Sequence, residues 1–178
     1  MLVFDDKQAP AFYPLCLTRS VGDLRCGILK LRQRIQAMFE SEDSEVWVEP
    51  RLVGLYRERH PDWKVNLPIA KGSIAVNSRL RSDPAQLARI AQLAEGECFV
   101  WQDQLVAFRA SEDHPVLPEL RDLIGLGYQA ETTEISLYRG LPDLIHDNER
   151  LLRLDFEQFF YDQDNYFETE PGVTTLHP

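Results

Sequence analysis

Apolar residues recur at alternating three- and four-residue steps between positions 20 and 38, a period that predicts a helix with one buried face. The residues of this apolar stripe are Val21, Leu24, Ile28, Leu31, Ile35 and Met38. Ser20 and Asp23 match the pattern of a helix N-terminal cap, so we expect the helix to begin at Ser20.

Short apolar runs between polar segments predict the strands of a sheet. These runs lie at residues 2–4, 46–48, 72–80, 98–101, 105–108 and 135–138. The two runs that flank residues 102–104 predict a hairpin. Further helices are expected at residues 51–60, from the Asp83-Pro84 pair onward, at 115–124 and at 147–161.

The early alternation of strands and helices, followed by a hairpin, favours an α/β domain with a mainly parallel sheet and an antiparallel excursion. In such sheets, ligands bind beyond the carboxyl ends of the strands. Asp5 and Asp6 follow the first strand directly, so they are expected to meet the residues around Ser20 at that edge.

Composition narrows the class of protein. The chain has 178 residues, 44% of them hydrophobic, which suits one domain with a substantial core. Its net charge of -10 and the lack of an evident basic patch argue against a nucleic-acid partner. No apolar stretch approaches the length of a membrane span, so no membrane partner is expected. The three cysteines have no metal-ligand spacing, and their odd number argues against a disulfide framework and favours a reducing cytoplasm.

Two groups of residues carry candidate chemistry at the expected ligand edge. Asp5 and Asp6 could hold a metal ion or accept hydrogen bonds from a sugar hydroxyl, although aspartates after a strand also cap turns. Thr18, Arg19 and Arg25 surround the expected helix start, where free N–H groups and arginine forks favour a phosphate. The alternative for both arginines is a surface ion pair with a nearby aspartate.

A third group follows the strand at residues 72–80. Asn77 could contact the edge of a base or sugar, and Arg79 could clamp a phosphate. Asn77 could equally hold a turn. The sequence has no glycine-rich phosphate loop of the common types. Asp143 and Asp155 are interpreted as helix caps or solvated charges.

Taken together, these segments resemble a bacterial sugar-nucleotidyltransferase family whose members are divergent relatives of N-acetylglucosamine-1-phosphate uridyltransferase. The resemblance rests first on F-D-D at 4–6, P-L-x-x-T-R at 14–19 and L-R-x-G-I-L at 24–29. Weaker matches are V-N-S-R-L at 76–80, and P-D-L-I-x-x-N at 142–148 followed by D-F at 155–156. Ser20 and Ser78 stand where the family usually has proline and glycine.

The resemblance implies a Rossmann-like, three-layer domain of the nucleotide-diphospho-sugar transferase type. It implies a reaction in which a sugar 1-phosphate and UTP or dTTP give a nucleotide sugar, for cell-envelope biosynthesis, and pyrophosphate. Mg²⁺ is the implied cofactor, with Asp5 or Asp6 as candidate ligands and no ligand set identified. Catalytic roles fall to Arg19, Arg25 and Asp5. Nucleotide or sugar-phosphate contacts fall to Asp6, Thr18, Gly27, Lys30, Asn77 and Arg79.

The resemblance also bears on domain organisation. Residues 1–161 are expected to form the transferase-like domain. Residues 162–178 are expected to be a protease-sensitive connector toward a carboxyl-terminal left-handed β-helix that carries acyl transfer and through which copies could assemble. Two alternatives remain open: a catalytically degenerate domain that binds nucleotide or assists assembly, and a subunit-contact module that binds no nucleotide.

Overall fold

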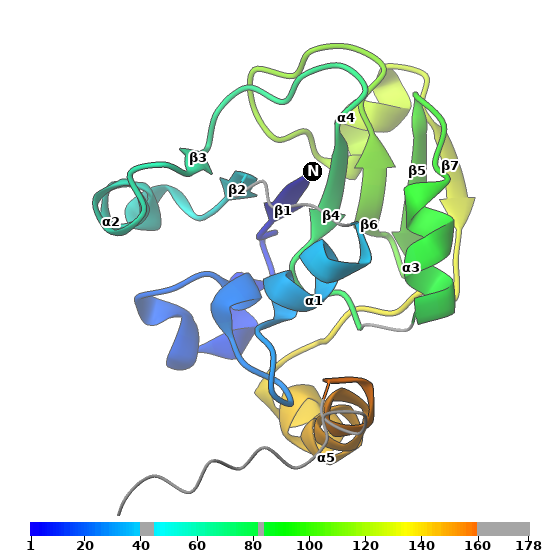
Figure 1. Cartoon of the computed structure of the whole chain (residues 1–178). Coiled ribbons are helices and arrows are strands. Elements are labelled where there is room, and N and C mark those ends of the chain that lie inside the picture. The colour runs from blue at the N-terminus through cyan, green and yellow to red at the C-terminus, as the bar shows by residue number, and fades with distance from the viewer. Residues whose placement is uncertain (40–44, 82–83, 160–178) are drawn as a thin grey trace, which may run out of the picture.

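The protein folds around a seven-stranded mixed sheet with strand order β3-β2-β1-β4-β6-β5-β7, seen in a computed structural model that describes residues 1–39, 45–81 and 84–159 (Figure 1). The strands are β1 Leu2–Phe4, β2 Glu45–Trp47, β3 Lys64–Val65, β4 Ile74–Asn77, β5 Glu97–Trp101, β6 Gln104–Arg109 and β7 Gln129–Thr132. Of the described strand pairs, only those that include β6 are antiparallel. The α/β class predicted from the sequence, a mainly parallel sheet with a hairpin, is therefore confirmed.

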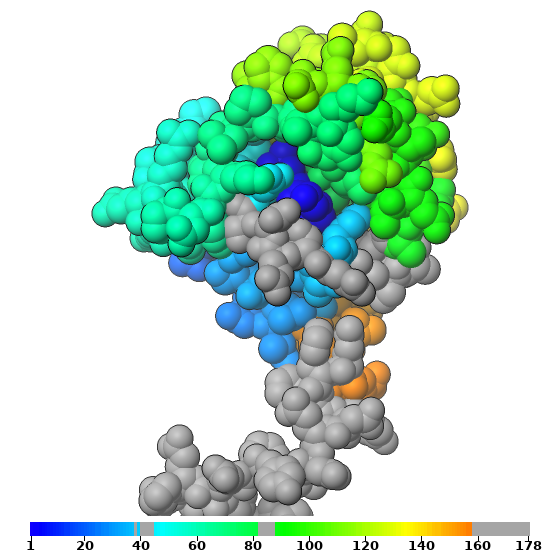
Figure 2. Space-filling view, turned by 45° about the horizontal axis from the view of Figure 1, so that its top comes forward, coloured from blue at the N-terminus to red at the C-terminus, as the bar shows by residue number. Residues whose placement is uncertain are grey.

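Helices cover both faces of this sheet. The helices are α1 Leu31–Met38, α2 Val53–Arg59, α3 Pro84–Ala91, α4 Leu120–Gly125 and α5 Leu141–Phe159. Alternate strand residues point to opposite faces. Val3 therefore packs in a core cluster with Ile35 of α1 and Ile90 of α3, whereas Phe4 shares its cluster with Leu123 of α4. The space-filling view shows β1, in dark blue, enclosed between its neighbours (Figure 2).

A third apolar cluster lies beyond the carboxyl end of β1. There α5 packs against the segment that follows β1, which contains the 3-10 turns η1 Ala9–Phe12, η2 Leu15–Leu17 and η3 Val21–Asp23 (Figure 1). A fourth turn, η4 Pro50–Leu52, leads into α2. Leu24 and Leu31 are buried in this cluster against Leu144 and Leu151 of α5. The edge at which ligands bind in such sheets is thus built by α5 as well as by the loops.

The prediction of one long helix from Ser20 is wrong. The segment instead forms η3 and α1, with a turn between them. Ser20 does cap a turn, because its hydroxyl accepts a hydrogen bond from the Gly22 N–H at 3.0 Å. Gly27 then adopts φ +74°, and Arg25 pairs with Lys30 across the turn. This left-handed backbone interrupts the helix. Four residues of the stripe are still buried, but in two different clusters: Val21, Leu24 and Leu31 lie in the cluster beneath α5, and Ile35 lies against the sheet.

Other differences concern short or polar elements. The hairpin is confirmed as β5 and β6. The strand predicted at 135–138 is reduced to one isolated bridge between Leu80 and Leu137. Strand β7 was not predicted, because its four residues are all exposed and carry no apolar pattern. Helix α5 begins six residues before the predicted start, and α4 begins later than predicted. Residues 162–178, the predicted connector, lie outside the described residues.

A buried ion pair fastens α1 to α5. The Arg34 guanidinium donates to both carboxylate oxygens of Asp155, with Nη2 to Oδ2 at 2.7 Å, and these side chains are 6% and 0% exposed. Asp155 Oδ2 also accepts from the Ile28 N–H at 2.8 Å. A Cβ at Gly27 would collide with this carboxylate, so the turn requires glycine for space as well as for its φ angle. The interpretation of Asp155 as a cap or a solvated charge is therefore wrong.

We predict that Arg34→Ala lowers the free energy of unfolding by roughly 3–5 kcal/mol, because it leaves the buried Asp155 charge without its partner. Urea denaturation followed by circular dichroism measures this change. Arg153→Ala is the matched control, since Arg153 on α5 pairs with Glu149 while both are about three-quarters exposed, and it should change stability little. Equal effects of the two substitutions would contradict the structural role of the Arg34–Asp155 pair.

Candidate functional site

Asp5 ties the end of β1 to two other segments. Its Oδ1 accepts hydrogen bonds from the hydroxyls of Ser20, at 2.8 Å, and Ser78, at 2.6 Å. Its Oδ2 accepts a long one from the Val21 N–H at 3.4 Å. The side chain is only 7% exposed. Burial raises the pKa of Asp5 from 3.8 to about 6, although the hydrogen bonds from Ser78, Ser20 and Val21 oppose this shift.

Asp6 forms a second, bidentate contact with Arg79. Arg79 Nε donates to Oδ1 at 2.9 Å, and Nη2 donates to Oδ2 at 2.5 Å. Asn77 Nδ2 also donates to Asp6 Oδ2, at 2.9 Å. Arg79 is 1% exposed and reaches the Tyr138 carbonyl and the Gln104 side chain as well. Asn77 and Arg79, both expected at a nucleotide or sugar, are therefore buried and bonded within the protein.

These contacts determine whether the carboxyl edge of the sheet can coordinate a magnesium ion. Mg²⁺ is held in proteins by carboxylate oxygens that are free to coordinate it. Here the Asp6 carboxylate is neutralised by Arg79, and Asp5 is buried with its oxygens bonded to hydroxyl and N–H donors. In the described ranges, no group of three or more His, Cys, Asp or Glu residues could hold a metal ion. The described residues do not fit a resident magnesium ion.

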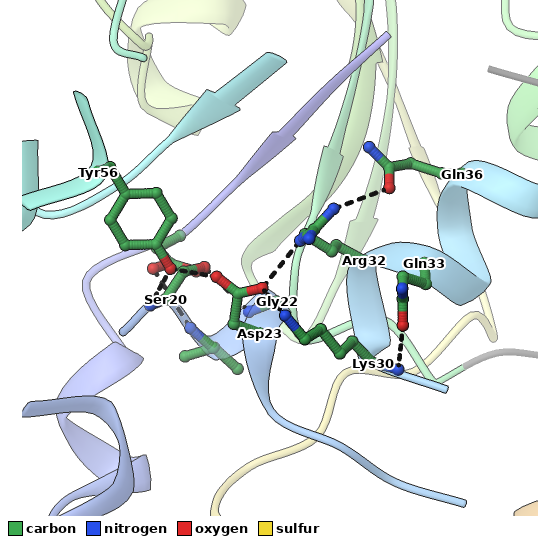
Figure 3. A network of polar contacts seen from close by, with 10 residues as sticks. Ser20, Gly22, Asp23, Lys30, Arg32, Gln33, Gln36 and Tyr56 are labelled. Atoms are coloured by element: carbon green, nitrogen blue, oxygen red, sulfur yellow. Dashed lines mark hydrogen bonds and ion pairs between the residues drawn. The ribbon is translucent and has the colours of Figure 1, made fainter. Parts of the chain in front are cut away.

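Asp23 anchors the Ser20 turn to α1 and α2 (Figure 3). Its carboxylate accepts hydrogen bonds from Arg32 Nε at 2.8 Å, from Lys30 Nζ at 3.1 Å and from the Tyr56 hydroxyl. The Tyr56 oxygen in turn accepts from the Ser20 N–H at 2.7 Å. Burial opposes ionisation of Asp23, but the bonds from Tyr56 and Arg32 hold its pKa below the usual value. Lys30, a predicted phosphate contact, is thus engaged with Asp23.

Arg19 and Arg25 line one cavity of about 610 Å³, together with Thr18 and Asn148. The rest of its lining is apolar: Pro14, Leu15, Leu24, Leu141, Leu144 and Ile145. Arg25 donates to the Ile28 carbonyl. Within the described part of the chain, neither arginine forms an ion pair, whereas most Lys and Arg side chains do. The predicted alternative of surface ion pairs is not observed for them.

Asp5 and Asp6 line a different cavity, of about 660 Å³, at the ends of β1 and β2 and the start of β6. Its other charged lining residues are Lys7, Glu49, Asp103, Glu119 and Arg121, so acids exceed bases. The structure therefore brings Asp5 to the Ser20 turn but does not place the aspartates and the arginines around one cavity. Gly27, also predicted to contact substrate, lies instead against α5.

The sequence reasoning missed the role of Ser20 and Ser78. Ser20 was predicted only as a helix cap and, like Ser78, as a departure from the family pattern, where proline and glycine are usual. In the structure, both hydroxyls donate to the same oxygen of Asp5. One signal for this role was available. Both departures from the family pattern introduce serine, Ser78 near the end of a predicted strand and Ser20 at the start of a predicted helix.

The strand order, the helices on both faces and the polar side chains at the carboxyl ends of β1 and β4 define a Rossmann-like, three-layer α/β domain. The chain belongs to the sugar nucleotidyl transferase family, whose sequence profile matches residues 1–163. Nucleotidyl transfer is the general activity of that family. None of the helices in the described ranges is long and apolar enough to cross a membrane.

Two solved structures are similar in outline. One is a nucleotidyl transferase from Methanothermobacter thermautotroptrophicus, 15% identical, with a TM-score of 0.48 over 86% of this chain and 97% of that one. The other, from Bacillus anthracis, was proposed to be a glucose-1-phosphate thymidylyltransferase and was crystallised with sucrose. It is 8% identical, with a TM-score of 0.43 over 85% of this chain and 94% of that one. No protein of curated function matches the chain.

The raised pKa of Asp5 predicts a specific pH dependence of stability. A carboxyl group whose pKa rises on folding stabilises the fold most below its unfolded pKa, and this contribution is lost as the pH rises through the folded pKa. Between pH 3.8 and about 6, the stability of the wild type relative to Asp5→Asn should therefore fall, by roughly 3 kcal/mol, and then level off.

Urea denaturation at several pH values measures this difference, and taking the difference cancels the opposite contributions of acids such as Asp23 and Asp155, whose pKa values are lowered. Asp62→Asn, at an exposed position, serves as the control and should show no such slope. A wild-type-minus-variant difference that stays constant from pH 4 to pH 7 would contradict the buried, protonatable state of Asp5.

Proposed function

We propose that this domain forms a nucleotide sugar and pyrophosphate from a sugar 1-phosphate and UTP or dTTP. Arg19 and Arg25 hold oxygens of the triphosphate, with Thr18 and Asn148 beside them in the cavity of about 610 Å³. The family gives the general reaction. The motifs at 4–6, 14–19 and 24–29 support a closer relation to N-acetylglucosamine-1-phosphate uridyltransferases.

The proposal rests on one observation: Arg19 and Arg25 form no ion pair among the described residues. They face a common cavity without carboxylates in its lining, in a chain that carries a net charge of -10. An arginine fork that meets no carboxylate is suited to phosphate oxygens, which it can bind with two parallel hydrogen bonds. The apolar remainder of the lining suits the flat, less polar part of a nucleotide.

The proposed chemistry is an in-line displacement. A phosphate oxygen of the sugar 1-phosphate attacks the α-phosphorus, a new P–O bond forms, and the bond to the β-phosphate oxygen breaks to release pyrophosphate. Because the nucleophile is already an anion, the protein mainly positions the reactants and neutralises charge. Magnesium arrives on the triphosphate as part of the substrate, since Asp5 and Asp6 are engaged within the protein.

The acidic cavity beside Asp5 and Asp6 has a separate place in this proposal. Its excess of carboxylates disfavours phosphate, whereas carboxylate oxygens accept hydrogen bonds from sugar hydroxyls. We therefore propose it for the hydroxyl-bearing part of the sugar. The three buried cysteines are free thiols, in keeping with the proposed cytoplasmic location. Attachment to a β-helix domain, and assembly through it, remain predictions of the sequence resemblance.

One observation favours the alternative of a domain that binds nucleotide without chemistry. The polar residues at the end of β4 already have hydrogen-bond partners within the protein, because Asn77 and Arg79 are buried and bonded to Asp6. A degenerate transferase would keep such a network for stability after losing turnover. The two proposals share the nucleotide site and differ only in the release of pyrophosphate.

A turnover assay separates them. We expect pyrophosphate release when the protein is mixed with magnesium, UTP or dTTP and a panel of sugar 1-phosphates, and no release when the sugar phosphate is omitted. Nucleotide binding measured by calorimetry without any release in the whole panel would favour the degenerate domain. The absence of both binding and release would contradict both proposals and favour a subunit-contact module.

Arg19→Ala and Arg25→Ala should each weaken nucleotide binding by about 1.5–3 kcal/mol, the usual contribution of a hydrogen bond to a charged group. Calorimetric titration with UTP and dTTP measures the loss. Thermal unfolding should change little, because both side chains are exposed and form no ion pair among the described residues. Arg153→Ala removes the same charge far along α5 and should bind nucleotide like the wild type. Normal affinity in both cavity variants would refute the assignment.

A further inference from the structure

A second, smaller hollow also borders Arg19 and lies between η3 and the end of α2. Its volume is about 220 Å³, below the roughly 300–1,000 Å³ typical of sites for drug-sized ligands. It is lined by Arg19, Asp23, Lys30, Tyr56, Arg59 and His60. Figure 3 shows Asp23, Lys30 and Tyr56 converging in this region. Arg19 lines both the larger cavity and the hollow.

The charges around the hollow are unbalanced. Arg19, Lys30 and Arg59 contribute three positive charges, and Asp23 contributes one negative charge. That carboxylate already accepts bonds from Tyr56, Lys30 and Arg32. Arg19 and Arg59 are exposed, and the structure records no ion pair or hydrogen bond for either side chain among the described residues. The hollow therefore has positive charge that the described part of the protein does not neutralise.

His60 adds a rigid polar group to this wall. Its ring stacks on Trp63 with centroids 3.8 Å apart, and the Arg32 guanidinium lies 4.3 Å from the centroid of the same Trp63 ring. Burial lowers the pKa of His60, and the nearby cations Arg32, Lys30 and Arg59 lower it further against the opposing effect of Asp23. A neutral imidazole can still donate one N–H to an anion, and its stacked position costs little further ordering on binding.

We infer that this hollow is a subsite for pyrophosphate, in which Arg59 and His60 of the α2 segment complete the site opposite Arg19. The inference rests on the proposed function, because the same hollow receives the β- and γ-phosphates of the triphosphate when its nucleoside part lies in the larger cavity. Two phosphates linked through one bridging oxygen carry several negative charges and match an excess of fixed cations in a small space.

Inorganic pyrophosphate is the probe, titrated calorimetrically into the full chain. Arg59→Ala should weaken pyrophosphate binding roughly 10- to 150-fold, the range expected for loss of a hydrogen bond to a charged group. Arg57→Ala is the matched control: it removes the same charge from the same helix, but Arg57 donates to the Val65 carbonyl and does not line the hollow. It should change the affinity less than threefold. His60→Gln, which keeps a donor but loses the stacked ring, should have an intermediate effect.

Circular dichroism melting of each variant establishes that it is folded before its affinity is compared. Wild-type affinity for pyrophosphate in Arg59→Ala, equal losses in Arg59→Ala and Arg57→Ala, or no binding to the wild type would each overturn the subsite. Arg59-dependent binding of pyrophosphate in a protein that shows no turnover would uphold the subsite and refute the proposed reaction. Turnover with a product-inhibition constant for pyrophosphate that is unchanged in Arg59→Ala would uphold the reaction and refute the subsite.

Discussion

A buried guanidinium, that of Arg79, organises the carboxyl edge of the sheet. A charge that is 1% exposed is costly unless it is paired and hydrogen-bonded. Arg79 meets this requirement with Asp6 at the end of β1, Gln104 at the start of β6 and the Tyr138 carbonyl before α5. The neighbouring Ser78 hydroxyl then bonds Asp5. The short segment after β4 that carries Ser78 and Arg79 thereby holds the end of β1, the start of β6 and the residues before α5 in fixed relative positions.

This arrangement also determines which charges are left for a ligand. The aspartates at the end of β1 are satisfied by the protein, so the edge that would ordinarily offer carboxylates to a metal ion is closed to that use. Positive charge that forms no ion pair among the described residues lines two other cavities instead, at Arg19, Arg25 and Arg59. These are the arginines to which we assign the triphosphate, and Asp23, Tyr56 and Arg32 hold the adjoining Ser20 turn in place.

Helix α5 also has a structural role in the site, because its side chains hold the turn around Gly27. Asn148 and Asp155 belong to one of the weaker motif resemblances. Both bond the turn around Gly27: Asn148 Oδ1 accepts from the Gly27 N–H and Asp155 Oδ2 from the Ile28 N–H, each at 2.8 Å. With Leu144 and Leu151 packed below, α5 forms one wall of the arginine-lined cavity. The motif thus serves the geometry of the turn that carries Arg25, in addition to any contact that Asn148 makes with a ligand.

The sequence by itself determined the elements marked by short apolar runs, which are the strand before Asp5 and the β5–β6 hairpin, together with the helix that ends before Pro61 and the α/β class of the fold. It also identified Arg19 and Arg25 as the arginines to follow, since local motifs carry that information. Tertiary structure decided the break at Gly27, the exposed strand β7 and the burial of Arg79, because these depend on contacts between residues far apart in the chain. The positions of Arg59 and His60 likewise depend on tertiary structure. Periodicity describes only which side of an element is buried, whereas the packing of α2 against the Ser20 turn brings these two residues to Arg19.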